Sequence, residues 1–118
     1  MRIHHLALRT DDLARLERFY AGVLGLAVTR RQGERSVWLD AGGAILMLEQ
    51  REAGEPRPDR ASMEMVAFEV PPTRAAELAR ALALAGHAEE GRTGSTIYVR
   101  DPEGRRLGLS AYPALLES

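Results

Sequence analysis

An internal repeat is the feature that most constrains how this 118-residue sequence can fold. The separation of 61 residues between Gly25 and Gly86 (86 − 25) is found again between Gly43 and Gly104 (104 − 43). Self-similarity at a fixed separation indicates two copies of one supersecondary unit. A chain of this length fits one domain of ordinary size, so we expect two half-sized modules rather than two independent domains.

Each copy follows the same order of expected elements, namely one strand, one helix and three further strands. Apolar residues at helical spacing predict each helix, and short β-like runs between turn residues predict the strands. In the first copy we expect a strand at 3–8, a helix at 13–24 and strands at 27–31, 35–39 and 44–49. In the second we expect a strand at 65–70, a helix at 74–85 and strands at 87–90, 95–100 and 105–110.

A polar stretch with two prolines separates the copies and predicts an exposed linker. We therefore place module one at residues 1–50, the linker at 51–62 and module two at 63–118. In module two, Asp101-Pro102-Glu103-Gly104 has the residue preferences of a type I turn and should join two strands of a hairpin. Asp40 lies 61 residues before Asp101 (101 − 40) and extends the repeat.

Composition excludes several partners and chemistries. The 16 basic and 17 acidic residues give a formal net charge of −1, so we expect no nucleic acid and no membrane partner. The N-terminus lacks the apolar stretch of a signal peptide, which predicts a cytoplasmic protein. The absence of cysteine excludes thiol catalysis and cysteine-ligated zinc. No glycine-rich fingerprint for a nucleotide cofactor is present.

Four segments carry a resemblance to a known family: His4-His5-Leu6-Ala7-Leu8, Asp11-Asp12-Leu13, Phe19-Tyr20 with Val23-Leu24-Gly25-Leu26, and Tyr98-Val99-Arg100-Asp101-Pro102-Glu103-Gly104. Together they resemble the vicinal oxygen chelate superfamily of glyoxalase I, bleomycin-resistance proteins and extradiol dioxygenases. The resemblance implies an α+β fold of two fused β-α-β-β-β modules, whose curved mixed sheets surround a cavity, often across a homodimer. It also implies a lyase, an isomerase, a dioxygenase or a protein that sequesters a drug.

The resemblance places one metal ligand on the first strand and one on the last strand of each module. The residues at these four positions are His5, Met47, Met65 and Gly108. Of these, only His5 is a sound ligand for a divalent transition metal, because thioethers suit copper(I) and glycine has no donor. We therefore expect no catalytic metal and no other cofactor. The alternative is a divalent metal held by His5 and Glu49, with Glu69 as a further ligand.

Strand alternation predicts which side chains line a metal-free, mostly apolar pocket for a small molecule. The expected ligand-binding residues are His5, Arg9, Ile45, Met47, Glu49, Met65, Ala67, Tyr98 and Gly108. His5 and Tyr98 are the candidate catalytic residues, the first as a general base and the second through its hydroxyl. The alternatives are a hydrogen-bonding imidazole in a binding pocket and a half-buried strand aromatic.

Several other side chains have two interpretations each. Arg100 and Arg106 either attract an acidic ligand or are solvated charges beside a turn. Arg9 has the better claim, because it shares its face with His5. Trp38 is able to stack on a planar ligand, but the pattern does not assign its face. Alternation predicts that His4 points away from His5.

Three function classes follow. We expect a small-molecule-binding protein that takes an apolar or amphipathic ligand without the usual metal, and works as a homodimer. The alternative is a metal-dependent lyase or dioxygenase that uses His5 and Glu49. A third class is a structural subunit whose cavity is filled.

Overall fold

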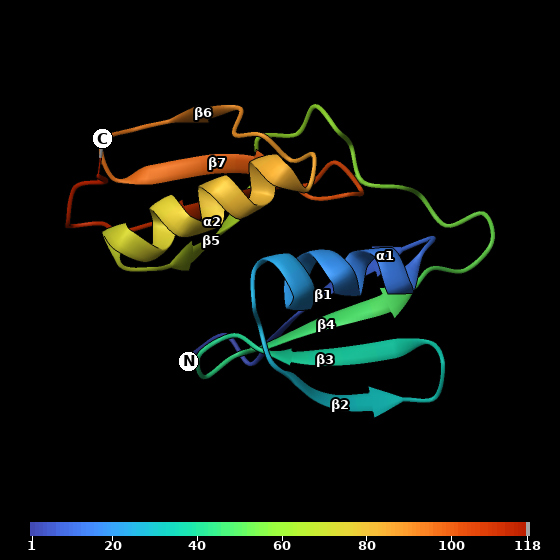
Figure 1. The fold of residues 1–118 in the computed structure, drawn as a ribbon. Coiled ribbons are helices and arrows are strands. Elements are labelled where there is room, and N and C mark those ends of the chain that lie inside the picture. The colour runs from blue at the N-terminus through green and yellow to red at the C-terminus, as the bar shows by residue number, and fades with distance from the viewer. Residues whose placement is uncertain (118) are drawn as a thin grey trace. The chain divides into compact units, whose positions relative to one another are not determined.

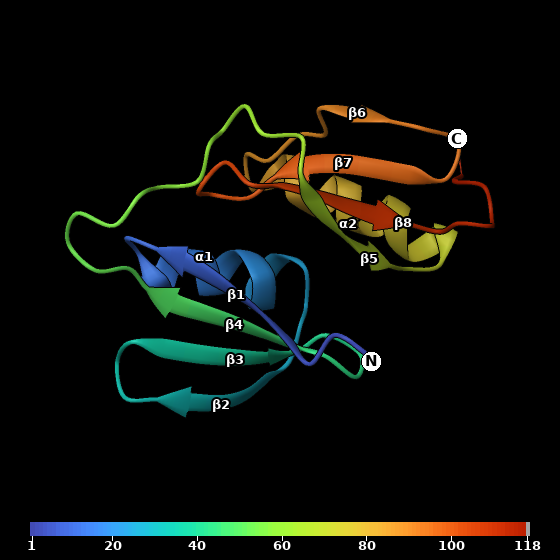
Figure 2. The ribbon, with the colours of Figure 1, turned by 180° about the vertical axis from the view of Figure 1, so that it is seen from behind.

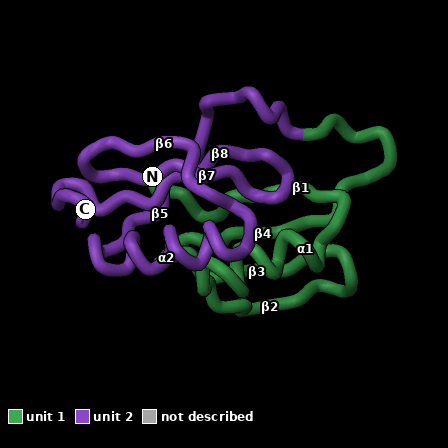
Figure 3. Tube along the Cα trace, turned by 45° about the horizontal axis from the view of Figure 1, so that its top comes forward, with its two compact units in different colours: residues 1–57 green, residues 58–118 purple. Residues whose placement is uncertain are grey.

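The computed structural model describes residues 1–117, and the chain divides into two compact units. Unit 1 comprises residues 1–57 and unit 2 begins at residue 58 (Figure 3). Each unit contains one four-stranded mixed sheet and one main helical segment (Figure 1). Within residues 1–117, no helix combines the length and the apolar character that a membrane crossing needs.

The sheet of unit 1 brings its first and last strands together. Its strands are β1 (His5–Thr10), β2 (Val28–Gln32), β3 (Ser36–Asp40) and β4 (Ile45–Gln50). Their order across the sheet is β1-β4-β3-β2. β1 runs parallel to β4, whereas β3 is antiparallel to both of its neighbours.

Unit 2 repeats this plan strand for strand. Its strands are β5 (Met65–Glu69), β6 (Gly91–Arg92), β7 (Thr96–Arg100) and β8 (Arg106–Ser110). Their order is β5-β8-β7-β6, with β5 parallel to β8. The predicted α+β fold with two β-α-β-β-β modules is confirmed, and both sheets are open rather than closed.

The first helix differs from the continuous helix predicted at 13–24. An α-helix, α1 (Leu13–Glu17), is capped at its N-terminus by Asp12, whose carboxylate accepts a hydrogen bond from the Arg15 N–H at 3.0 Å. It continues as a π-helical segment, η1 (Arg18–Val23). The wider π turn accommodates two successive buried aromatic residues, Phe19 and Tyr20, whose rings pack edge to face at 4.9 Å.

The second helix, α2 (Pro72–Leu84), starts two residues before the predicted range and ends close to its predicted end. Proline at its first turn needs no N–H partner, and Gly86 follows it with φ +89°. The strand predicted at 87–90 is wrong, because the His87 N–H still bonds to the carbonyl of Leu82 at 2.7 Å. The ladder with β7 therefore begins later, and β6 spans only Gly91–Arg92.

The hairpin predicted at Asp101-Pro102-Glu103-Gly104 is confirmed. The Asp101 carboxylate is buried and accepts hydrogen bonds from the N–H groups of Glu103 (2.8 Å) and Arg105 (3.0 Å). Gly104 adopts φ +86° and donates to the Asp101 carbonyl at 2.9 Å. This turn joins β7 to β8 and fixes their register.

In each unit, the helix covers one face of the sheet, and no helix of the same unit covers the other face, which we call the open face (Figure 2). The buried leucines of α1 and α2 include Leu16, Leu78 and Leu82. The buried apolar side chains of the strands are Val37, Leu39, Leu46, Leu48, Ile97, Val99, Leu107 and Leu109. Because strand side chains alternate, their neighbours in sequence define the open face.

Candidate functional site

The open face of unit 1 carries the module-one residues expected to bind a ligand. His5 pairs with Ile45, and two residues further Ala7 pairs with Met47. Arg9 then pairs with Glu49 at the far end of β1 and β4. The parallel register therefore brings His5, Arg9, Ile45, Met47 and Glu49 onto one surface.

His5 is exposed at the start of β1, and its neighbour is His4. The two Nδ1 atoms lie 3.0 Å apart, and the rings meet edge to face with centroids at 5.2 Å. The expectation that His4 points away from His5 is wrong, because β1 begins at His5 and strand alternation does not extend to the residue before it. One imidazole thus donates a hydrogen bond to the other, and the tautomers decide which of the two is the donor.

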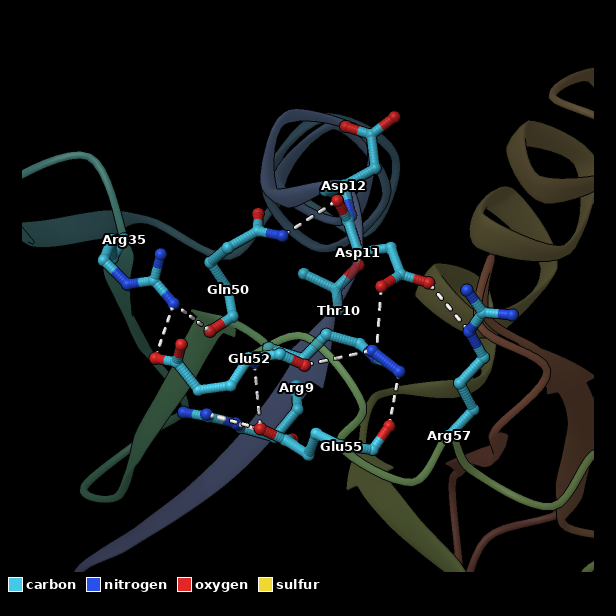
Figure 4. A network of polar contacts seen from close by, with 10 residues as sticks. Arg9, Thr10, Asp11, Asp12, Arg35, Gln50, Glu52, Glu55 and Arg57 are labelled. Atoms are coloured by element: carbon cyan, nitrogen blue, oxygen red, sulfur yellow. Dashed lines mark hydrogen bonds and ion pairs between the residues drawn. The ribbon is translucent and has the colours of Figure 1, made fainter.

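Arg9 is paired with two carboxylates, Glu49 and Glu55, and Figure 4 shows the pair with Glu55. Its Nε and Nη2 bind Glu55 at 3.0 and 2.7 Å, and its Nη1 lies 3.4 Å from Glu49. The hydrogen bonds from Arg9 and then from the Glu52 N–H lower the pKa of the Glu55 carboxyl to about 2. The same pairing raises the pKa of the Arg9 guanidinium. Arg9 therefore faces a surplus of negative charge.

Glu55 belongs to a segment that the sequence predicts to be an exposed linker. Asp11 accepts from the Nε of Arg57 at 2.9 Å and lies 3.1 Å from the Nε of Arg51 (Figure 4). The Arg51 Nε is close enough to Asp11 for an ion pair, but its N–H is not aligned for a hydrogen bond. A further Arg51 nitrogen, Nη2, donates to the Glu55 carbonyl. Residues 51–57 are thus attached to the end of β1 by charge-assisted contacts.

Trp38 lies on the open face of unit 1, which the sequence pattern did not assign. It pairs across the strands with Met47. Its indole Nε1 donates to Ser36 Oγ at 3.2 Å, and the Arg30 guanidinium lies 5.0 Å from the ring centroid. The ring is half-buried, so part of it remains available to a ligand on this face.

The open face of unit 2 carries the module-two residues expected to bind a ligand. Met65 pairs with Arg106, and Ala67 pairs with Gly108. Gly108 also pairs with Tyr98 on its other side. The guanidinium of Arg106 lies over the Tyr98 ring, 4.0 Å from its centroid. Tyr98 is therefore bounded by a cation on the same face.

A single carboxylate connects two arginines on this face. Glu90 accepts from the Nε of Arg100 at 2.9 Å and from the Nε of Arg106 at 2.8 Å. These hydrogen bonds lower the pKa of the Glu90 carboxyl. The sequence interpretation missed Glu90 and Glu55. Each of these carboxylates binds an arginine from another part of the chain, and no local pattern connects the partners.

Gly108 occupies a position where a side chain would be tightly packed. A Cβ atom there would lie 3.1 Å from the Met65 Cε, 3.1 Å from the Thr96 Cγ2 and 3.4 Å from the Ala67 Cβ. The methyl of Met65 thus covers the place from which a metal-binding side chain would extend.

The donor set does not fit a divalent transition-metal centre of the kind that the resemblance implies. At the four positions where the resemblance places metal ligands, Met47 and Met65 carry thioethers, and Gly108 has no side-chain donor. Glu49 is paired with Arg9, and Glu69 lies at the exposed end of β5. Among residues 1–117, no three His, Asp or Glu side chains form a group able to hold a metal ion.

A separate groove of about 320 Å³ lies beside α2 in unit 2. Ala76, Ala79, Ala83 and Ile97 form much of its wall. Ile97 faces the helix side of the sheet, so this groove is not on the open face. None of the residues expected to bind a ligand lines it.

The class of protein follows from the repeated fold. Each unit is an open mixed sheet whose first and last strands pair in parallel. The sequence model of the Glyoxalase/Bleomycin resistance protein/Dioxygenase superfamily matches residues 2–109. The chain belongs to this superfamily.

Individual proteins are also similar to this chain. The chain is 31% identical to the virulence protein STM3117 of Salmonella typhimurium, over 94% of this chain and 84% of that protein. It is similar in structure to a glyoxalase/dioxygenase from Nostoc punctiforme, with a TM-score of 0.77 at 22% identity, covering 92% of this chain and 88% of the other. It is also similar to the fosfomycin resistance protein FosX from Mesorhizobium loti, with a TM-score of 0.73 at 21% identity, covering 92% and 90%. The likeness to these two structures concerns the fold.

Proposed function

We propose that this chain is a small-molecule-binding member of the superfamily that holds an apolar or amphipathic ligand on the open faces of its sheets without the usual metal. The observation that carries the proposal is the donor set at the four expected ligand positions. Only His5 among them offers a donor that such metals prefer, because Met47 and Met65 carry thioethers and Gly108 carries no side chain.

The side chains of the open faces support a ligand of this chemistry. Ile45, Met47, Met65 and Ala67 supply apolar surface, and methionine adapts its shape to more than one ligand. A few polar groups, among them His5 and Tyr98, are available to orient the bound molecule. Such a surface fits sequestration as well as chemistry that needs no metal, with His5 or Tyr98 moving a proton.

Elemental analysis is the first test. The purified chain would be incubated with zinc, nickel, manganese and ferrous iron, then desalted and analysed, together with His5→Ala and Glu49→Ala. We expect no stoichiometric metal. Bound metal that disappears with either substitution would overturn the proposal in favour of a metal-dependent lyase or dioxygenase.

A thermal-shift screen then tests ligand binding directly. Small apolar acids, apolar neutral metabolites and antibiotics are suitable probes, fosfomycin included because the fold is shared with a fosfomycin resistance protein. A ligand that binds the native state raises the melting temperature. If no compound in a broad set raises the melting temperature, the binding proposal is wrong and the chain is better explained as a structural subunit.

We also propose that the chain works as a homodimer. Open sheets leave edge strands with unpaired backbone groups, and pairing or covering such edges removes them. Light scattering should give twice the mass of 13.0 kDa. A monomeric mass would contradict this part of the proposal.

A further inference from the structure

Each open face carries a group of paired charges, and the two groups have opposite compositions. In unit 1, the single guanidinium of Arg9 is matched by the two carboxylates of Glu49 and Glu55. In unit 2, the single carboxylate of Glu90 is shared by the two guanidinia of Arg100 and Arg106. The first group has a formal charge of −1 and the second a formal charge of +1. An anion is therefore attracted to the group of Arg100, Glu90 and Arg106 more than to the group around Arg9.

The two arginines of unit 2 differ in the donors that they leave for a ligand. Arg100 donates to Glu90 and, through its Nη1, to the carbonyls of Ser62 at 2.8 Å and Gly104 at 3.2 Å. These bonds join the loop before β5 to the hairpin, so Arg100 is engaged in holding the fold. Arg106 donates its Nε to Glu90, and its Nη1 lies 3.6 Å from the Met65 sulfur. Its Nη2 has no hydrogen bond to any of residues 1–117.

The Arg106 guanidinium is also held in place. Its side chain is 15% exposed, Glu90 fixes one edge, and the Tyr98 ring lies against its plane at 4.0 Å. A cation positioned in advance binds an anion with less loss of conformational entropy than a free surface arginine does. Partial burial further strengthens the attraction, because fewer water molecules screen it.

The surface beside this cation is apolar. Met65 is the neighbour of Arg106 across the parallel pair, and Ala67 lies two residues further along β5. Gly108, on the same face, presents only backbone. A ligand bound here would meet one fixed positive group next to a flat apolar area.

We propose that Arg106 binds the acidic group of the ligand, and that the ligand is a small apolar molecule with one carboxylate. This inference rests on the proposed function and narrows it to a class of ligand. It assigns the anion to Arg106 rather than to Arg9, which the sequence interpretation favoured. One negative charge matches the single excess positive charge of the group.

Benzoate and benzamide are the probes, because they share an apolar ring and differ in charge. Each would be titrated into the full-length chain and followed by ¹H–¹⁵N NMR, including the Nε–Hε signals of the arginines. We expect benzoate to bind roughly tenfold more tightly than benzamide, the size of one charge-assisted hydrogen bond. The Arg106 Nε signal should shift more than any other arginine Nε signal.

Variants separate the role of Arg106 from a general effect of charge. Arg106→Gln should abolish the preference for benzoate, whereas Arg106→Lys should keep most of it and also assign the Arg106 signal by its disappearance. Arg92→Gln is the matched control, since Arg92 lies in the same sheet but pairs with one carboxylate of its own, Glu89, at 2.6 and 2.7 Å. It should leave the preference unchanged.

Equal affinity for benzoate and benzamide would overturn the assignment of the ligand class while leaving the binding proposal intact. A preference that persists in Arg106→Gln would overturn the role of Arg106. If Arg106→Gln does not fold, the wild-type shift pattern decides, and a larger benzoate shift at Arg9 than at Arg106 would overturn it. Failure of both probes to bind also overturns the inference, and the thermal-shift screen then tests the proposed function separately.

Discussion

Arg9 and Glu55 form a two-point ion pair across 46 positions of the sequence, with Nε–Oε2 and Nη2–Oε1 distances of 3.0 and 2.7 Å. Arg9 belongs to the first strand of unit 1, and Glu55 follows the last strand of that unit. The pair thereby connects the segment after β4 to β1. Its orientation engages both oxygens of the carboxylate and two nitrogens of the guanidinium, the geometry that arginine favours with carboxylates.

Replacing Glu55 should produce a stability loss that depends on pH. The pKa of Glu55 in the folded protein is about 2, below its ordinary value of 4.5. The unfolded state therefore binds a proton more readily, and the stabilisation is present above pH 4.5 and lost as the pH falls towards 2. Glu55→Gln should lower the melting temperature at pH 7. As the pH falls towards 2, the melting temperatures of the variant and the wild type should converge. Glu34→Gln, an exposed residue between β2 and β3, serves as control. A difference that does not change with pH would contradict the pairing.

Gly108→Ala should destabilise the protein because its Cβ meets the side chains of Met65 and Thr96 at 3.1 Å. Overpacking of this kind costs about 1 kcal/mol or more in the free energy of unfolding. Gly91→Ala is the matched control, since nothing lies within 4 Å of a Cβ built there. Urea denaturation measures both variants. Equal stability of Gly108→Ala and wild type would show that this position is open.

Asp101→Ala should be more destabilising than Asp40→Ala, although the repeat relates the two aspartates. Asp101 is 3% exposed and accepts two backbone hydrogen bonds, so its loss leaves two donors without partners. A cost of about 2 kcal/mol is expected. Asp40 is exposed and accepts one such bond, from the Gly42 N–H at 2.9 Å. Water replaces that bond, so a cost below about 1 kcal/mol is expected in the same urea titration. The reverse order of the two costs would refute this explanation.

Trp38 should report a ligand on the unit 1 face. It is the single tryptophan of the chain and lies half-buried beside Met47. Any compound that raises the melting temperature by binding this face should therefore shift or quench the tryptophan emission. Met47→Leu should alter the size of the change, whereas Leu84→Ala, which removes a side chain 90% exposed on α2, should not. A stabilising ligand that leaves the emission unchanged would have to bind elsewhere.

Much of the fold is predictable because it depends on local signals. The glycines that define the repeat adopt positive φ angles in both copies, +82° at Gly25 and +89° at Gly86. Alternation along β4 and β8 then assigns the buried and open faces. The π-helical turn after α1 is not visible in the sequence, because apolar periodicity does not separate an α-helix from a π-helical segment that buries the adjacent Phe19 and Tyr20.

The charges of the candidate site are predictable only in part. Placing Arg9 on the His5 face needs strand alternation alone. Its partner Glu55 lies in a segment with no regular structure, so no periodic pattern connects the two. Glu90 likewise precedes a two-residue strand and reaches Arg100 and Arg106 only after the ladder has formed. Which arginine has a donor left for a ligand is therefore a property of the folded units and not of residue types.

The duplicated plan has an evolutionary consequence. Each sheet makes its ladder of hydrogen bonds within its own unit, so a substitution on one open face leaves the strand register of the other unchanged. The two copies of the repeat carry charge groups of opposite sign, with an excess carboxylate around Arg9 and an excess guanidinium around Glu90. Selection can act on either face alone, and a new ligand preference requires changes in only half of the chain.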